Sequence, residues 1–363
     1  MEYKISDKIH VARFILVVGL IWVHFGAFPG ESLSPFTGVV DPTYYTPSFL
    51  NSFFTYFFLS SVPLLSFISG YLFLNKGIPA YKGTLIKKAN TVLLPSLIWS
   101  GAWVCIALAL YILGKPYGLF TDYEKVFSEL NAFVLIDQTI GFTESPLAFQ
   151  FWFINDLLLS IIISPILIYL LQRFSWILIL ALTILWLAEV PTFGFYNYKV
   201  ILYFCIGLLF QIKQYKVNTL ISSKIFAVAF PIFISLTVLR ILLPAHYDGD
   251  MPFETSIEFV LRMAGAVAMI NIIFNLDKYT PALFSWVRKH SHAAFFIFAA
   301  HFPFIMILKQ ALFKVGIFNS EIGFILLWLV TPFLCLFILL IASNVIKISL
   351  PKLYFIINGQ RIA

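Results

Sequence analysis

The chain has 363 residues and a formal net charge of +7, with 61% hydrophobic and 11% charged residues. Soluble domains contain about 45–50% apolar and about 25% charged residues, so this composition excludes an ordinary soluble protein and indicates a membrane protein. The positive charge predicts basic cytoplasmic loops and attraction to anionic headgroups or to an anionic cofactor, and not nucleic-acid binding.

Ten apolar segments have about the length of about 20 residues that a helix needs to cross the hydrocarbon core. They cover residues 9–28, 49–74, 91–113, 151–171, 174–190, 194–212, 225–243, 257–276, 291–312 and 323–346. We therefore expect an all-α, polytopic integral membrane helix bundle of about ten transmembrane helices. No soluble domain or linker interrupts the series, so residues 1–363 are expected to form one domain.

The orientation of the bundle follows from its charged connections. Lysine and arginine are frequent at both termini and in connections 75–90, 213–224 and 277–289. Acidic residues instead concentrate in 122–144 and 246–258. Because cytoplasmic loops are enriched in lysine and arginine, we expect both termini to be cytoplasmic.

The longest expected outer connection covers residues 114–150. Within it, residues 126–136 have an apolar helical face, which suits a short helix lying in the membrane interface over the outer mouth of the bundle. A surface helix with no role in substrate access is the alternative.

The first apolar segment carries two ionisable residues, Arg13 and His24, which are 11 residues apart. At about 100° per residue the two side chains share one helical face, and they are about 16 Å apart along the axis. This spacing suits a long, thin molecule with an anionic head, such as a coenzyme A thioester. The alternative is that Arg13 anchors the helix end by snorkelling and that His24 is an ordinary interfacial residue.

The fourth apolar segment places Asp156 at a depth similar to that of His24, because the segment enters from the outer side. A carboxylate there could stabilise a protonated imidazole and fix its tautomer, which makes Asp156 the first candidate partner of His24. The structural alternative is that Asp156 accepts hydrogen bonds from a neighbouring helix or pairs with Arg262. Trp152 and Phe153 could stack on a sugar ring, although aromatic belts at membrane interfaces explain them equally well.

Two further groups of ionisable residues lie in the later segments. Glu258 and Arg262 are one helical turn apart and are expected to form an ion pair. His301, near the middle of the ninth segment, is either a polar residue lining an acyl tunnel or a histidine that a neighbouring helix satisfies.

Several other chemistries lack their sequence motifs. The chain has no Gly-rich phosphate loop of the Walker or Rossmann type, no cluster of histidine and cysteine with zinc spacing, and no Gly-x-Ser-x-Gly nucleophile motif. His290 and His292 flank one serine at a basic membrane edge, a pattern typical of solvated residues, so we expect no metal.

Several segments together resemble one family of membrane enzymes. They are RFILVVGLIWVH at 13–24, SVPLLSFISGYLFLNK at 61–76, LIKKANTVLLPSLIW at 85–99, FWFINDLLLSIIISPIL at 151–167, YFCIGLLF at 203–210 and FFIFAAHFPFI at 295–305. In combination these motifs resemble the acyltransferase-3 family, whose polytopic members acylate sugars of surface polysaccharides and related glycans. The resemblance runs from the first apolar segment to the ninth.

The resemblance implies a role for several residues of the basic half of the site. Family members use cytoplasmic acyl-CoA, and they need the first-span arginine and histidine, whose positions Arg13 and His24 occupy. The basic stretch before the third span is usually arginine-rich in the family and is Lys87 and Lys88 here. Those two residues and Lys82 are therefore expected either to bind phosphate or only to enforce the orientation of the loop.

The resemblance also implies a function and a location. We expect an O-acyltransferase, and most simply an O-acetyltransferase, in a bacterial cytoplasmic (inner) membrane, with acetyl-CoA or another acyl-CoA as donor. Its acceptor would be a sugar hydroxyl of a surface polysaccharide or lipid-linked glycan at the outer face. His301 matches the late-span histidine of the family. A glycan or lipid transporter or flippase, or a non-catalytic subunit of a polysaccharide export system, is the alternative.

Overall fold

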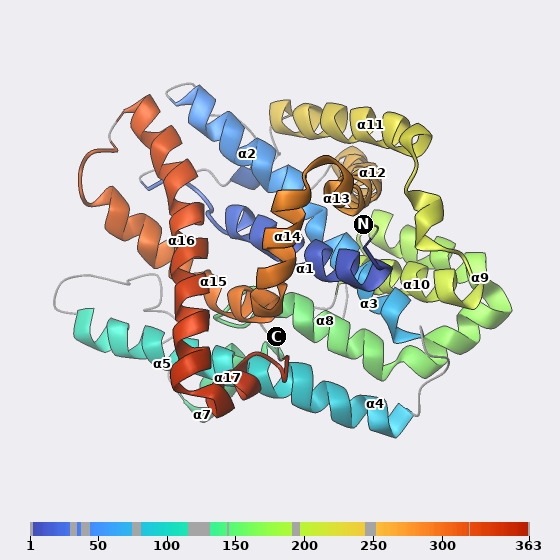
Figure 1. Ribbon diagram of the computed structural model, residues 1–363, viewed down its shortest axis with the longest axis horizontal. Helices are drawn as coiled ribbons and strands as arrows, with labels where there is room; N and C mark the ends of the chain where they lie inside the picture. The colour runs from blue at the N-terminus through green and yellow to red at the C-terminus, as the bar shows by residue number, and fades with distance from the viewer. Residues whose placement is uncertain are drawn as a thin grey trace.

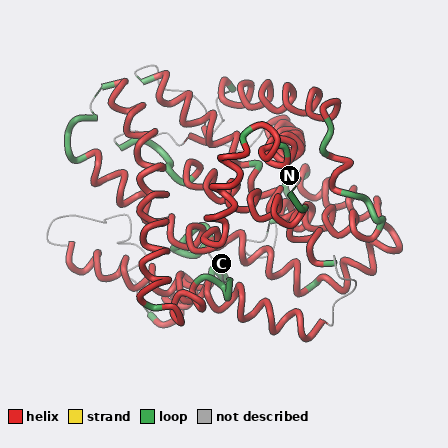
Figure 2. Tube along the Cα trace, in the orientation of Figure 1, coloured by secondary structure: helices red, strands yellow, loops and turns green. Residues whose placement is uncertain are grey.

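The computed structural model describes residues 3–29, 35–37, 44–74, 81–114, 131–143, 145–190, 197–243, 252–318 and 320–361. Within these residues every regular element is a helix, as Figure 2 shows. The expected all-α class is therefore confirmed.

The helices follow one another along the chain without a soluble domain between the described segments. In order they are α1 (Ile5–Val23), α2 (Tyr45–Leu59), α3 (Ser61–Phe73), α4 (Tyr81–Lys88), α5 (Leu94–Gly114), α7 (Ala132–Ile140), α8 (Phe151–Ile162), α9 (Ser164–Leu187), α10 (Tyr198–Ile212), α11 (Ser223–Leu242), α12 (Pro252–Phe274), α13 (Leu276–Tyr279), α14 (Pro281–His290), α15 (Ala294–Phe313), α16 (Glu321–Ser349) and α17 (Pro351–Ile357). Figure 1 shows the long helix α16 along one side of the molecule.

Seven helical stretches of the described chain are long and apolar enough to cross a membrane. They are Tyr45–Phe73, Tyr81–Leu113, Ser164–Leu187, Ser223–Leu242, Glu254–Tyr279, Pro281–Phe313 and Glu321–Ser349. Helices α8 and α10 are apolar but shorter, and the 19 residues of α1 include three charged side chains. Ten crossings and two cytoplasmic termini therefore remain expectations.

The fourth and fifth apolar segments are divided differently from the expectation. Helix α8 ends at Ile162 and α9 begins at Ser164, with Pro165 in its first turn. Proline is tolerated at a helix start because its missing N–H would be unpaired there. Helix α9 then continues through the expected boundary at 172–173 and is kinked at Phe174, where φ is −130° and ψ is 27°.

The expected interfacial helix at 126–136 is described only from residue 131. The structure has α7 instead at Ala132–Ile140, and the side chain of Asn131 accepts a hydrogen bond from the Val134 N–H at its start. Phe133 and Ile136 are exposed, whereas Asp137 and Gln138 are buried. The apolar residues of this helix thus face away from the rest of the chain.

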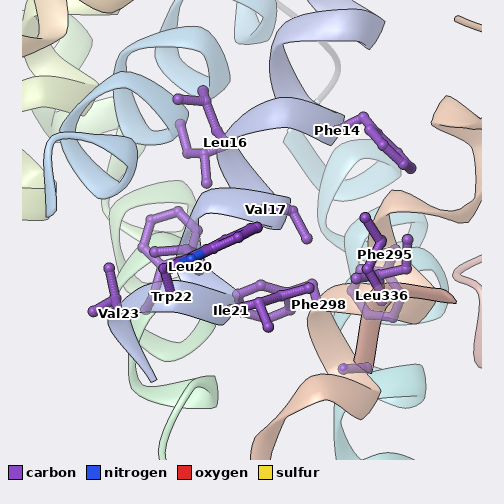
Figure 3. Packing of buried hydrophobic residues seen from close by; sticks show 14 of the residues in the cluster. Phe14, Leu16, Val17, Leu20, Ile21, Trp22, Val23, Phe295, Phe298 and Leu336 are labelled. Carbon is purple, nitrogen blue, oxygen red and sulfur yellow. The ribbon is translucent and has the colours of Figure 1, made fainter. Parts of the chain in front are cut away.

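Helix α1 is the central helix of the fold. It contacts α2, α3, α12, α14, α15 and α16, and most of its residues from Val11 to Val23 are buried. Figure 3 shows several of its side chains in one cluster with Phe295 and Phe298 of α15 and Leu336 of α16. Because it is enclosed in this way, α1 presents its polar residues to the interior of the bundle.

Helices α3 and α10 cross at two glycines. A Cβ on Gly70 would collide with the Phe204 carbonyl oxygen, and a Cβ on Gly207 would collide with backbone atoms of Phe67 and Tyr71. Small residues allow helix backbones to approach closely in membranes. Two of the motifs quoted above, SGYL and YFCIGLLF, therefore meet each other in space.

We expect Gly207→Ala to destabilise the protein by about 1–3 kcal/mol, because the new methyl group has only backbone atoms to displace. Gly83→Ala is the matched control, since a Cβ at Gly83 has no atom within 4 Å, and alanine is favoured over glycine in a helix. Thermal unfolding in detergent measures both. Equal melting temperatures for the two variants would contradict the close helix crossing.

Candidate active site

A cavity of about 960 Å³ lies along one face of α1. Asp7, His10, Arg13 and Val17, each three or four residues from the next, contribute that face. The other walls come from Leu65 and Ser69 of α3, Phe153, Ile154 and Leu157 of α8, and Phe295 and Phe298 of α15. The cavity is therefore polar at one end of the α1 face and apolar toward the other.

Three basic side chains from distant parts of the chain, Arg13, Lys88 and Arg361, line this cavity. None of them takes part in a salt bridge within the described residues. Burial, and after it the charge of Arg13, lowers the pKa of Arg361 to about 10. Like charges held together without a carboxylate favour a bound anion.

The expected basic stretch is only partly at this cavity. Lys88 lines it, and a π-helical turn, Ala89–Leu93, follows directly. Lys82 and Lys87 are exposed and are not among the lining residues. Of the three lysines, only Lys88 is therefore placed to touch a ligand in this cavity.

A pair of histidines lies beyond the apolar end of the cavity. His24 follows the last residue of α1, and its Nδ1 is 2.8 Å from Nε2 of His301 on α15. The two rings are parallel, with an interplanar angle of 2°. The rings of Phe149 and Phe302 flank His24, with their centroids 6.2 Å and 5.3 Å from that of the imidazole.

The hydrogen bonds determine the tautomers of the pair. Nδ1 of His301 lies 2.7 Å from the carbonyl oxygen of Phe298 and 3.1 Å from that of Ile297. A carbonyl oxygen only accepts, so Nδ1 of His301 carries the proton and its Nε2 accepts. His24 must then donate from Nδ1, which leaves Nε2 of His24 unprotonated and able to act as a base.

A break in α15 presents His301 to His24. Phe302 has non-helical angles, φ −118° and ψ 134°, and Pro303 has no N–H to donate to Ala299 four residues earlier. Gln150 and Trp103 donate to the Ala299 carbonyl instead, both at 3.1 Å, and Gln150 also donates to that of Phe302 at 2.8 Å. The helix thus ends its first half at His301 with its carbonyls satisfied.

The chain after His24 is held by a buried lysine. Nζ of Lys309 donates to the carbonyl oxygens of Phe25 and Ala27, both at 2.6 Å, and Asn51 donates to that of Gly26 at 2.9 Å. Gly26 has a φ of +68°, which glycine adopts without strain. Sequence reasoning did not select Lys309, although a lysine inside an expected span was a visible signal.

Phe298 lies between the cavity and the histidine pair. It lines the cavity, and its ring centroid is 6.0 Å from that of His301. Phe153 also lines the cavity and lies 6.3 Å from Phe298. The structure therefore places Phe153 in the inner wall, while the half-exposed Trp152 packs against Phe149 and Phe153.

Asp156 has a different partner from the one that the sequence favoured. Its Oδ2 accepts a hydrogen bond from the backbone N–H of Asn197, at the start of α10, at 3.1 Å, and the residue is 2% exposed. The imidazole of His24 is bonded to His301 instead. The expected pair of Arg262 and Glu258 is confirmed at 3.0 Å, so Arg262 does not depend on Asp156.

We expect Asp156→Ala to lower the melting temperature and to leave the turnover of the remaining folded protein unchanged, because the lost contact holds α10 and not His24. Asp156→Asn keeps a side-chain oxygen that can accept the Asn197 N–H and is the matched control. Activity and thermal unfolding are measured on the same preparations. A loss of turnover in Asp156→Asn without a loss of stability would restore the catalytic interpretation.

A bundle whose central helix joins a basic cavity to a histidine base fits a membrane enzyme that transfers a group from an anionic donor. Residues 6–345 match the Acyltransferase domain model of the acyltransferase-3 family, so the chain belongs to this family, as the motifs predicted, and is an acyltransferase. It is 26% identical over 366 residues to the "Succinoglycan biosynthesis protein ExoH" of Rhizobium meliloti (strain 1021), covering 99% of this chain and 94% of the relative. No solved structure matches the chain.

Proposed function

We propose that this protein transfers an acyl group, most simply acetyl, from cytoplasmic acyl-CoA to a sugar hydroxyl of a surface polysaccharide or lipid-linked glycan at the outer face of a bacterial cytoplasmic membrane. One observation carries the proposal. A single face of α1 joins a cavity with unpaired cations at Arg13 to a histidine whose Nε2 is free to accept a proton. The printed name of the relative, a protein of succinoglycan biosynthesis, supports a polysaccharide acceptor.

Donor binding would use the length of the cavity. The phosphates of acyl-CoA lie against Arg13 and Lys88, since guanidinium and ammonium groups both bind phosphate. The pantetheine arm then follows Val17 and Leu65 toward Phe298. From Val17 to His24 the helix rises about 10 Å, so the arm has to pass Phe298 before the thioester meets the histidine pair. An aromatic ring in that passage favours a short acyl group such as acetyl.

Acyl transfer then needs one base. Nε2 of His24 accepts the proton of the sugar hydroxyl while the hydroxyl oxygen attacks the thioester carbonyl carbon. The C–S bond breaks, coenzyme A departs as the thiolate, and the imidazolium returns the proton to that sulfur. The Nδ1–H of His24 donates to His301 throughout, which keeps the ring oriented and stabilises its charged form.

We expect His301→Leu to lower kcat by about tenfold or more and to leave the KM for acyl-CoA unchanged, because His24 loses the acceptor that fixes its tautomer. His301→Gln keeps a side-chain oxygen for the His24 Nδ1–H and a donor for the backbone carbonyls, so it should retain most activity. Steady-state kinetics with both substrates separate these effects. A rise in KM alone would instead support a role of His301 in lining the acyl path.

The decisive experiment supplies labelled acetyl-CoA to the purified protein in liposomes that contain a lipid-linked glycan. Labelled glycan is the expected product. Movement of glycan across the membrane without consumption of acetyl-CoA would support the transporter alternative and overturn the proposal. Cysteine placed at exposed position 82 and treated with an impermeant thiol reagent reports which side of the membrane the donor reaches.

A further inference from the structure

The C-terminal segment folds back onto the basic end of the cavity. Asn358, which is fully buried, accepts a hydrogen bond from the Phe296 N–H at 3.2 Å and donates to the carbonyl oxygen of His292 at 3.0 Å. The indole N–H of Trp99 donates to the carbonyl oxygen of Ile357 at 3.0 Å. These contacts join residues 357 and 358 to α5 and to the start of α15.

A tight turn then directs the chain into the cavity. Gly359 and Gln360 both have positive φ, 67° and 59°. A Cβ on Gly359 would collide with the carbonyl oxygen of Thr91, so the turn packs directly against the π-helical turn after Lys88. Gln360 and Arg361 consequently line the cavity.

Arg361 is held in place without being neutralised. Its Nη1 donates to the carbonyl oxygen of Asn358 at 3.1 Å, and its guanidinium lies 4.6 Å from the centroid of the Phe295 ring. Arg13 and Lys88 share the same cavity, and no carboxylate forms a salt bridge with any of the three in the part of the chain that the structure describes. Fixing a third cation beside two others is unfavourable unless an anion joins them.

We propose that Arg361 is a phosphate-binding residue of the donor site, and that residues 351–361 form a strap that keeps it there. The ligand class is a phosphate-rich group with several negative charges, and its identification with the phosphates of acyl-CoA rests on the proposed function. A guanidinium can bind two phosphate oxygens at once, which an ammonium cannot. The strap therefore adds a directional contact to the two cations from α1 and α4.

The test compares three variants in nanodiscs made of zwitterionic lipid. Arg361→Gln removes the charge, Arg361→Lys keeps the charge without the planar fork, and Lys352→Gln is the control, because Lys352 is an exposed cation of the same strap outside the cavity. Binding of coenzyme A and of inorganic pyrophosphate is measured by calorimetry, and thermal unfolding is followed on the same samples. Arg361→Gln is expected to weaken coenzyme A binding by about tenfold, with Arg361→Lys between it and the wild type.

The outcomes separate the proposal from the function on which its ligand depends. Unchanged coenzyme A affinity in Arg361→Gln, or an equal loss in Lys352→Gln, overturns the role of Arg361. Pyrophosphate binding that depends on Arg361, in a wild-type protein that does not bind coenzyme A, supports the phosphate site and overturns the donor. Arg361-dependent exclusion of pyrophosphate by phosphatidylglycerol added to the nanodiscs identifies a lipid headgroup as the occupant and also overturns the donor.

Discussion

His24→Ala is expected to lower acyl transfer by about 10²–10⁴-fold, which is the usual contribution of a general base. The reason is geometric. Nε2 of His24 is the one nitrogen of the histidine pair that carries no proton and donates no hydrogen bond, since His301 donates to backbone carbonyls and accepts from His24. Removing the imidazole leaves the acceptor hydroxyl without a base, while the basic end of the cavity stays intact.

The measurement is single-turnover acyl transfer, with coenzyme A affinity measured on the same protein. His290→Ala is the matched control, because His290 is a histidine outside the cavity and hydrogen-bonded only to the Trp286 carbonyl oxygen among the described residues. Affinity for coenzyme A should be unchanged in both variants. Wild-type turnover in His24→Ala would falsify the role of His24 as the base.

Arg13 provides the second large effect. Arg13→Gln should raise the KM for acyl-CoA by more than tenfold, because a cation next to the donor phosphates disappears from a cavity that offers no substitute at that depth. Arg13→Lys tests the shape of the contact. If the planar fork binds phosphate, the lysine variant loses affinity as well, by a factor of ten for each 1.4 kcal/mol or so of lost interaction.

The alternative meaning of Arg13 makes a different prediction for the same two variants. If Arg13 only orients the first helix, lysine serves equally well, because the positive-inside effect depends on charge and not on shape. Saturation kinetics for acyl-CoA are therefore combined with thiol labelling of a cytoplasmic loop in each variant. Equal kinetics for arginine and lysine, with only glutamine impaired in insertion, would reduce Arg13 to an anchor.

The part of the site on α1 could be predicted from the sequence because it depends on local geometry. Helical periodicity alone placed Arg13 and His24 on one face, and the structure has that face along the cavity and ends it at the histidine pair. The pair of Glu258 and Arg262 was predictable for the same reason, since both residues belong to one helix.

Contacts between helices were much less predictable. His24 and His301 are 277 residues apart, and their contact depends on a break in α15 whose free carbonyls are satisfied from α5 and α8. Depth in the membrane therefore selected Asp156, a plausible neighbour, whereas packing selected His301. Arg361 was missed because nothing in a basic C-terminal segment shows that a buried asparagine will turn it back into the bundle.

Membrane crossings illustrate the same limit. Hydropathy located all of the apolar segments, but it cannot distinguish a straight span from one that is divided. Pro165 ends the first part of the fourth segment early, and the kink at Phe174 lies inside a helix that hydropathy separated into two. The backbone, and not the composition, decides where these helices bend.

The distance between the two ends of the α1 face has a bioenergetic consequence. The proton removed from an outer hydroxyl by His24 leaves with the coenzyme A thiol on the cytoplasmic side, so one positive charge moves inward for each uncharged acyl group that moves outward. Full passage of one charge through a potential of 100 mV is worth about 2.3 kcal/mol. An inside-negative membrane would thus drive each acylation forward, and the respiring cell would supply part of the free energy for decorating its own surface.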